Sequence, residues 1–310
     1  MTERDIDPGV HRRKLRSILR QLRENCGKTQ SATALEMSWS VSKLIRIESG
    51  SVTISVNDLR ALVRSYGITD DERIEELVQL ARLARGHSWL NGYKDVASDE
   101  YLAYLAYEEL AVRSYNFQPV LVPGLLQTEE YAIEVIRTIR GPKIPSRLEK
   151  LVELRISRQE KVFSRTDQFD LYFLLDESVV RRPVGSAAIM RKQLQRLDEL
   201  SQRDNVTIGI IPFTAGFYRS IRVPFVVFEF SQPEDQAILY LEYPKKEEII
   251  REDVPALNGE AGSGPTSPPT YLEIFAELQQ RTSAEQTVGI LQNALADMAT
   301  QAQVSEPELS

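Results

Sequence analysis

Basic side chains gather near the start of this chain and could bind a polyanion. Residues 10–47 contain nine lysines and arginines and only two acidic residues, which gives a net charge of +7. Residues 96–310 contain 22 basic and 32 acidic residues, a net charge of −10. A basic segment on an acidic body is typical of a nucleic-acid-binding module joined to a second domain. The alternative is a basic helix face that is merely solvated.

Residue types that support metal or covalent chemistry are scarce. The 310 residues include one cysteine, Cys26, and two histidines, His11 and His87. A single cysteine excludes an internal disulfide and a cysteine-based zinc site, and two histidines argue against a multi-histidine metal site or a catalytic relay. The segment PGLLQT lacks the glycine spacing and the lysine of a phosphate-binding loop. We therefore expect no catalytic residues, no metal and no cofactor.

Charged residues in the C-terminal part could line a ligand or partner site. Acidic and basic residues follow an expected strand at 169–175, and others share one face of an expected helix at 146–163. The candidate residues are Arg158, Asp176, Glu177 and Arg182. A salt-bridge network that holds helices to a sheet explains the same residues, and we favour this second interpretation.

The first 86 residues have the pattern of five short helices. Apolar residues recur with a helical period over 10–26, which places Cys26 on the buried face, and Gly27 ends that helix. Helices are expected over 30–37 and 41–48, followed by two more. The residues that can cap these four helices are Thr29, Ser40, Ser55 with Asp58, and Thr69 with Glu72. We expect an all-α domain at 10–86.

The rest of the chain mixes the two kinds of structure. Helical patterns cover 99–115, 146–163, 187–202 and 271–298, and strand patterns cover 169–175, 205–213, 224–230 and 237–243. Prolines and glycines in 253–270 predict a loop. We expect an α+β multidomain chain whose C-terminal domain, at 96–299, is a mixed α/β domain with a small sheet flanked by helices.

One run of motifs resembles a known DNA-binding domain. After the basic helix come Thr29-Gln30, Ala34, a short turn, Ser40-Val41-Ser42-Lys43 and Ile47-Glu48. This order resembles the helix-turn-helix of the lambda-repressor/Cro class, also called the xenobiotic-response-element (XRE) family, and a small residue such as Ala34 suits the close crossing of its two helices. Two departures are Ser38, where many members have a turn glycine, and Thr33, in a usually apolar position.

The resemblance implies a set of DNA contacts, because the third helix of that class enters the major groove. Its base-contacting positions correspond to Ser40, Val41, Ser42 and Arg46. Phosphate contacts are implied for Gln30, Lys43, Arg12 and Arg16. Arg46 is the sharpest candidate, since a guanidinium can bond both acceptors of a guanine edge. Glu48 is expected to be structural and to pair with a basic residue of the first helix.

The resemblance extends over about residues 10–300. Segments 118–132, 155–160, 175–185, 205–218 and 224–230 are similar to the large actinobacterial regulators related to WhiJ. These proteins join the DNA-binding domain to an α/β C-terminal domain, and many are encoded beside a small partner protein in an antitoxin-like arrangement. The segment 253–270 is longer than that family leads us to expect.

We therefore expect a transcriptional regulator, such as a repressor, that binds double-stranded DNA as a homodimer and receives a protein or small-molecule signal through its C-terminal domain. Two alternatives stay open: an enzyme with a DNA-targeting head, and an antitoxin-like protein that binds a small partner encoded nearby and regulates its own synthesis. The sequence has no apolar run that could span a bilayer and no signal-peptide core at its start, so we expect a cytoplasmic protein without membrane contact.

Overall fold

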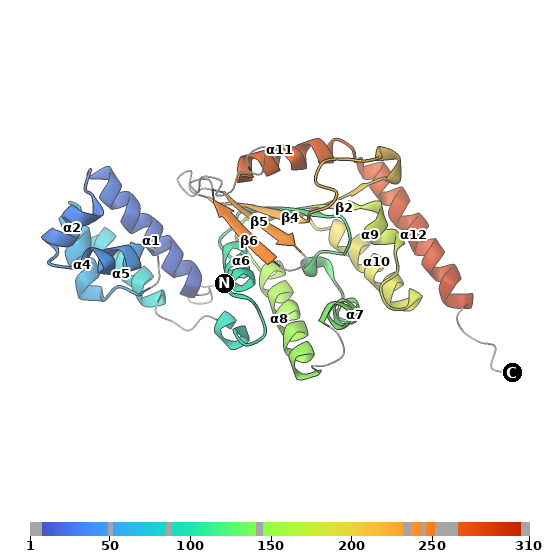
Figure 1. The fold of residues 1–310 in the computed structure, drawn as a ribbon, viewed down its shortest axis with the longest axis horizontal. Helices are drawn as coiled ribbons and strands as arrows, with labels where there is room; N and C mark the ends of the chain where they lie inside the picture. The colour runs from blue at the N-terminus through green and yellow to red at the C-terminus, as the bar shows by residue number, and fades with distance from the viewer. Residues whose placement is uncertain are drawn as a thin grey trace. The chain divides into compact units, whose positions relative to one another are not determined.

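A computed structural model describes residues 8–48, 52–84, 89–140, 145–231, 237–243, 246–251 and 266–304. The chain forms two compact units, Met1–Gly92 and Tyr93–Ser310. Figure 1 shows an all-helical N-terminal unit in blue and a C-terminal unit built around a sheet. The expected fold class, an all-helical N-terminal region and a mixed α/β C-terminal domain, is confirmed.

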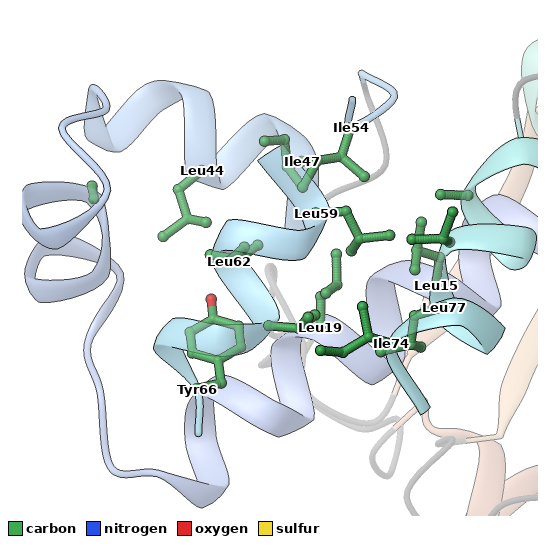
Figure 2. Close-up of a cluster of buried hydrophobic side chains, with 14 residues drawn as sticks. Leu15, Leu19, Leu44, Ile47, Ile54, Leu59, Leu62, Tyr66, Ile74 and Leu77 are labelled. Atoms are coloured by element: carbon green, nitrogen blue, oxygen red, sulfur yellow. The ribbon is translucent and has the colours of Figure 1, made fainter. Parts of the chain in front are cut away.

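The described residues of the N-terminal unit form five α-helices, and a short 3-10 helix, Trp89–Tyr93, follows them. The α-helices are α1 (Pro8–Asn25), α2 (Gln30–Glu36), α3 (Val41–Glu48), α4 (Val56–Ser65) and α5 (Asp71–Leu83). Leucine and isoleucine side chains from α1, α3, α4 and α5 share one buried core (Figure 2). Because this core includes Leu44 and Ile47 of α3, the orientation of α3 is fixed by the rest of the unit.

Local capping explains where these helices begin. The Thr29 hydroxyl accepts a hydrogen bond from the Ala32 N–H at 3.1 Å, and the Ser55 hydroxyl accepts one from the Asp58 N–H at 3.0 Å. The fifth helix differs from expectation, because its cap is Asp70 and not Thr69. The Asp70 carboxylate accepts from the Glu72 N–H, and a carboxylate is also favoured by the positive end of the helix dipole.

The expected burial of Cys26 is wrong, because its side chain is exposed. Helix α1 ends at Asn25, and Gly27 turns the chain with a φ of 68°. Cys26 therefore lies just beyond the last turn that contributes to the core, and its thiol donates to the Arg23 carbonyl at 3.2 Å.

The described residues of the C-terminal unit form a six-stranded sheet in the order β3-β2-β1-β4-β5-β6. The strands are β1 (Arg113–Gln118), β2 (Asp170–Asp176), β3 (Val206–Ile211), β4 (Phe225–Glu229), β5 (Ile238–Tyr243) and β6 (Lys246–Arg251). Strands β1, β2 and β3 run parallel, whereas β4, β5 and β6 continue the sheet antiparallel from the other side of β1. Strand β1 is therefore where the sheet changes from parallel to antiparallel.

Helices cover both faces of this sheet (Figure 1). The α-helices are α6 (Asp99–Glu108), α7 (Glu129–Arg140), α8 (Pro145–Phe163), α9 (Glu177–Arg181), α10 (Ala187–Ser201), α11 (Pro268–Gln279) and α12 (Ala284–Val304), with short 3-10 helices at Gly124–Leu126 and Phe213–Ala215. On one face, Ile274 and Phe275 of α11 pack on Phe117, Phe225 and Leu239. On the opposite face, α6 and α8 cover β1, β4 and β5.

Three expectations for this unit need correction. The helix expected over 99–115 ends at Glu108, and its last three residues begin β1. The helix expected over 271–298 is two helices, α11 and α12, because Ser283 begins a new helix and its hydroxyl accepts from the Gln286 N–H. Strand β6 was not expected at all. Of the loop expected over 253–270, residues 253–265 lie outside the described residues, and α11 begins at Pro268.

Candidate nucleic-acid interface

A tight turn sets the angle between α2 and α3. Ser38 has a positive φ of 56°, a conformation that L-residues adopt at a cost and glycine adopts freely. The Trp39 N–H then donates to the Ala34 carbonyl at 2.8 Å, and the Ser38 N–H donates to the Leu35 carbonyl at 3.1 Å. Ser38 thus adopts the backbone conformation that a glycine would adopt without strain at this position of the turn.

Buried apolar residues hold the inner face of α3. Ala34 of α2 is almost fully buried, as the close helix crossing requires. Figure 2 shows Leu44 and Ile47 pointing from α3 towards Leu59 and Leu62 of α4. Thr33 is also fully buried, and its hydroxyl lies near that of Tyr66, although neither hydroxyl has a hydrogen-bond partner among the described residues.

A buried ion pair joins the end of α1 to the end of α3. The Arg23 guanidinium donates to both Glu48 carboxylate oxygens, at 2.7 and 3.1 Å, and to the Lys28 carbonyl at 2.9 Å. The hydrogen bond to Glu48 raises the pKa of Arg23. Gln30 donates to the same carboxylate at 2.8 Å. The expectation that Glu48 pairs with a basic residue of the first helix is confirmed, and this network links three helices through one carboxylate.

The outer face of α3 is exposed. Ser42 and Arg46 lie one helical turn apart on this face, and so do Val41 and Ile45, which are 39% and 45% exposed. The Arg46 Nε donates to the Ser42 carbonyl at 3.4 Å. Ser40 caps the helix, since its hydroxyl accepts from the Lys43 N–H at 3.2 Å. Ile45 was missed from sequence, although its spacing of four residues from Val41 was a sufficient signal.

Three of the residues expected to contact phosphate are engaged inside the unit. Gln30 bonds Glu48, as described above. The Lys43 ammonium lies 3.1 Å from an Asp58 carboxylate oxygen and 4.0 Å from the centre of the Trp39 ring. The Arg12 guanidinium donates to the Ala84 carbonyl at the end of α5, at 3.1 Å, and Arg16 is half-buried on α1. The Lys43 side chain of α3 is thus held by Asp58 and Trp39, whereas Arg12 links α1 to the end of α5.

Comparisons with known families bear on both units. A family described as a helix-turn-helix domain matches residues 15–77, which include α2, the turn and α3. A second family, described as a domain of unknown function (DUF5753), matches residues 101–256, half of the chain. The chain belongs to the DUF5753 family. Its helix-turn-helix domain suggests DNA binding. Comparison with curated proteins and with solved structures found no match.

In the DUF5753 domain, Arg158 forms a buried ion pair. Its guanidinium donates to the two Glu108 carboxylate oxygens, at 2.6 and 2.7 Å, and to the Tyr104 hydroxyl at 2.6 Å. Burial is the largest single effect and lowers the pKa of Arg158, but the charge and hydrogen bond of Glu108, together with Tyr104 and Tyr101, outweigh it and hold this pKa well above its ordinary value. Arg158 thus ties α8 to α6, as a structural salt bridge would.

The other C-terminal candidates, Asp176, Glu177 and Arg182, lie at or just after the end of β2. Asp176 and Glu177 have hydrogen-bond partners of their own. The Asp176 carboxylate accepts from the Tyr218 hydroxyl at 2.5 Å and from the Ser178 N–H at 2.9 Å, which makes it the cap of α9. Glu177 accepts from the Phe213 N–H at 2.8 Å and from Arg181 at 3.1 Å. Arg182 is exposed. Asp176 and Glu177 are thus adjacent, and Arg158 shares none of the hydrogen-bond partners named for them.

Among the helices that the described residues form, none is long and apolar enough to cross a membrane. No group of three or more metal-ligating side chains occurs among the same residues.

Proposed function

We propose that this chain is a sequence-specific DNA-binding transcriptional regulator of the lambda-repressor/Cro (XRE) class, with a WhiJ-like arrangement in which the DUF5753 domain receives a signal. The observation that carries the proposal is the exposed face of α3, which a buried core and a three-helix ion-pair network hold in place. A rigid helix with polar and small apolar side chains on its open side is what readout of a major groove requires.

Each exposed residue of α3 has a contact that suits its chemistry. The Arg46 guanidinium can donate to O6 and N7 of one guanine, and Val41 and Ile45 can pack on thymine methyl groups. Ser40 and Ser42 can donate or accept hydrogen bonds and so discriminate bases weakly. Phosphates are contacted by Gln30, Lys43 and Arg16, and Lys43 exchanges its Asp58 partner for a phosphate oxygen.

The proposal includes a homodimer. One recognition helix reads only a few base pairs, so specific binding needs two half-sites, spaced about 34 Å apart on an inverted repeat. The chain acts by binding, without turnover. The signal is a protein or a small molecule. A small protein encoded nearby is one candidate in a WhiJ-like arrangement, and we expect a signal of either kind to change the DNA affinity of the full chain.

The test begins with DNA sites selected from a random pool by the full chain. Arg46→Ala should weaken binding to the selected site by about 1–3 kcal/mol and relax the preference at one base pair. The matched control is Arg73→Ala, because Arg73 is an exposed arginine on α5 that pairs with Glu76. Fluorescence anisotropy on selected and scrambled DNA measures both variants.

If Arg46→Ala weakens binding to selected and scrambled DNA equally, Arg46 contacts only phosphate and does not read a base. A full chain that selects no DNA sequence at all would remove the proposed function. Light scattering that shows a monomer both free and on the selected site would contradict the dimer, and turnover of a metabolite by the full chain would contradict a pure binding role.

A further inference from the structure

A cavity of about 180 Å³ lies in the C-terminal unit, on the sheet face opposite α11. Its floor is formed by β1, β4, β5 and β6, and its walls by α6, α7 and α8. None of the DNA-binding residues contributes to it. The cavity is therefore a separate candidate site for a small-molecule signal, inside the C-terminal unit.

Strand register places polar residues side by side on the cavity floor. Asn116 of β1 pairs with Val226 of β4, which pairs with Tyr240 of β5. Two residues further along β5 is Glu242, whose neighbour in β6 is Glu247. Because side chains alternate along a strand, Tyr240 and Glu242 point to the same side of the sheet. The floor thus carries an amide, an aromatic ring and two carboxylates.

Two polar groups at this cavity lack partners. Asn116 is only 3% exposed, and its side-chain oxygen has no hydrogen bond from any described residue. The Arg155 Nε is likewise buried without a partner in the described part of the chain, while its Nη1 donates to Gln127 at 2.5 Å. Buried polar groups in proteins are nearly always hydrogen-bonded, so the Asn116 oxygen needs a donor and the Arg155 Nε needs an acceptor, which either water or a ligand can supply.

The cavity also carries charge of both signs. Arg158 is neutralised by Glu108, which leaves the Arg155 guanidinium on the α8 side. Glu242 and Glu247 repel each other across β5 and β6, and Glu247 accepts a hydrogen bond from the Ser98 hydroxyl. A simple anion would be repelled by the two carboxylates, and a simple cation would be repelled by Arg155. A molecule with one positive and one negative group can pair with the carboxylates and with Arg155 at the same time.

The remaining lining sets the size and polarity of the rest of the ligand. Val135, Ile136, Leu151 and Leu154 give an apolar wall from α7 and α8. Tyr101, Tyr104 and Tyr240 form an aromatic cluster, with ring centres of neighbours 4.5–5.8 Å apart. A dry cavity of about 150 Å³ holds benzene, so this cavity of about 180 Å³ encloses a group slightly larger than benzene, and its open side leaves room for the charged end of a ligand.

We propose that the cavity of the DUF5753 domain binds a free amino acid with an apolar side chain. Its carboxylate pairs with Arg155, its ammonium group is held by Glu242 and Glu247, and its side chain packs on the wall from α7 and α8. The inference rests on the proposed function, for which this molecule is a signal that the regulator senses.

The experiment measures thermal unfolding of the full chain, by far-ultraviolet circular dichroism, with each of the common L-amino acids at about 10 mM, since a ligand that binds only the folded state raises Tm by mass action. L-leucine or L-phenylalanine is expected to raise it. Leucinamide lacks the carboxylate and 4-methylpentanoate lacks the ammonium group. Calorimetry should show each of them binding at least about tenfold more weakly than leucine, because each loses one charge-assisted contact.

Matched variants assign the two ends of the ligand. Glu242→Gln should weaken leucine binding about tenfold or more and leave 4-methylpentanoate unchanged, because only leucine has the ammonium group. Arg155→Met should weaken leucine and leave leucinamide unchanged. The control is Glu248→Gln, since Glu248 neighbours Glu247 in β6 but bonds Lys246 and does not line the cavity. Glu242→Gln preserves side-chain shape, so it keeps the test decisive if Arg155→Met does not fold.

No rise in Tm with any amino acid, or unchanged leucine binding in both variants, would overturn the inference. A chain that selects a DNA site yet binds no amino acid loses only this inference. A chain that binds leucine yet selects no DNA sequence loses only the proposed function.

Discussion

Ser38 carries the turn between α2 and α3 in a conformation that suits glycine. Its φ of 56° is unfavourable for a residue with a Cβ atom. Ser38→Gly should therefore raise the free energy of unfolding of the N-terminal unit by up to about 1 kcal/mol, the strain removed being partly offset by the greater chain entropy of glycine. Urea unfolding followed by tryptophan fluorescence measures this, because both tryptophans, Trp39 and Trp89, lie in that unit.

The control for this substitution is Ser31→Gly. Ser31 is exposed within α2, where glycine is less favourable than serine and lowers stability by roughly a few tenths of a kcal/mol. The free energy of unfolding is expected to rise in Ser38→Gly and to fall in Ser31→Gly. If both variants are less stable than the wild type, the Ser38 side chain stabilises the turn by more than its positive φ destabilises it.

Glu242 makes the stability of the C-terminal unit depend on pH. Its side chain is exposed to the open cavity, but the surrounding protein still raises the pKa of its carboxyl by desolvation, Glu247 raises it further, and Arg155 and Arg158 oppose the shift. Since the folded state then holds this proton more tightly than the unfolded chain, stability is lost as pH rises from the ordinary glutamate range through the raised pKa. Without ligand, Glu242→Gln should raise Tm at neutral pH and flatten its pH dependence.

Circular dichroism melts of both proteins from about pH 5 to pH 8 test this sign. Glu229→Gln is a control, because Glu229 bonds Arg113 and Tyr115 and lies outside the cavity lining. Parallel pH curves for wild type and Glu242→Gln would contradict the assignment.

At the scale of helices, the Arg23–Glu48 pair decides how α3 is held. Arg23→Met leaves the buried Glu48 carboxylate with Gln30 as its named partner and should lower unfolding free energy by about 3–5 kcal/mol. The double variant Arg23→Met/Glu48→Leu removes both charges and should recover most of that loss. Tryptophan-monitored urea unfolding of the full chain compares the two. A double variant as unstable as Arg23→Met would mean that the pair contributes specific packing and not only charge compensation.

Elements with local signals were predictable from sequence. Caps such as Thr29 and Ser55 act within three residues, so their chemistry is visible without a structure. Strand β1 was not predictable, because the helical pattern from α6 continues into it and only its pairing with β2 and β4 makes it a strand. Strand β6 begins with charged residues and lies at the sheet edge, where an apolar pattern is not required.

The same distinction holds for the candidate interface. The exposed face of α3 follows from helical period alone. The internal partners of Lys43 and Arg12 do not, because Asp58 and Ala84 lie 15 and 72 residues away in sequence. The cavity of the C-terminal unit was missed for the same reason, since Asn116, Arg155 and Glu242 come together only through the sheet and α8.

For the whole molecule, the separation of charge predicts how DNA binding responds to salt. The chain has a net charge of −7, but residues 10–47 carry a net charge of +7, and charges farther than about 10 Å apart are largely screened at 0.1 M salt. The logarithm of the DNA affinity should fall steeply with the logarithm of salt, by about 0.9 for each phosphate contacted.

Arg16→Gln should reduce that slope by up to about one unit and weaken selected and scrambled DNA alike. Anisotropy titrations from about 50 to 200 mM salt measure it, with Arg73→Gln as the exposed arginine control. If the salt dependence of Arg16→Gln has the same slope as that of the wild type, Arg16 does not contact phosphate.

The central place of β1 in the sheet also constrains how the protein is made. Arg113 of β1 pairs with Glu229 of β4, and 116 residues separate them. A ribosome adding about 5–20 residues per second leaves one edge of β1 open for roughly 5–25 s. Helix α11, which covers Phe117 and Phe225, emerges later still. The nascent chain is therefore most exposed to aggregation between the synthesis of β1 and that of α11, and a ribosome that stalls in this interval releases a product with an open strand and a bare apolar face.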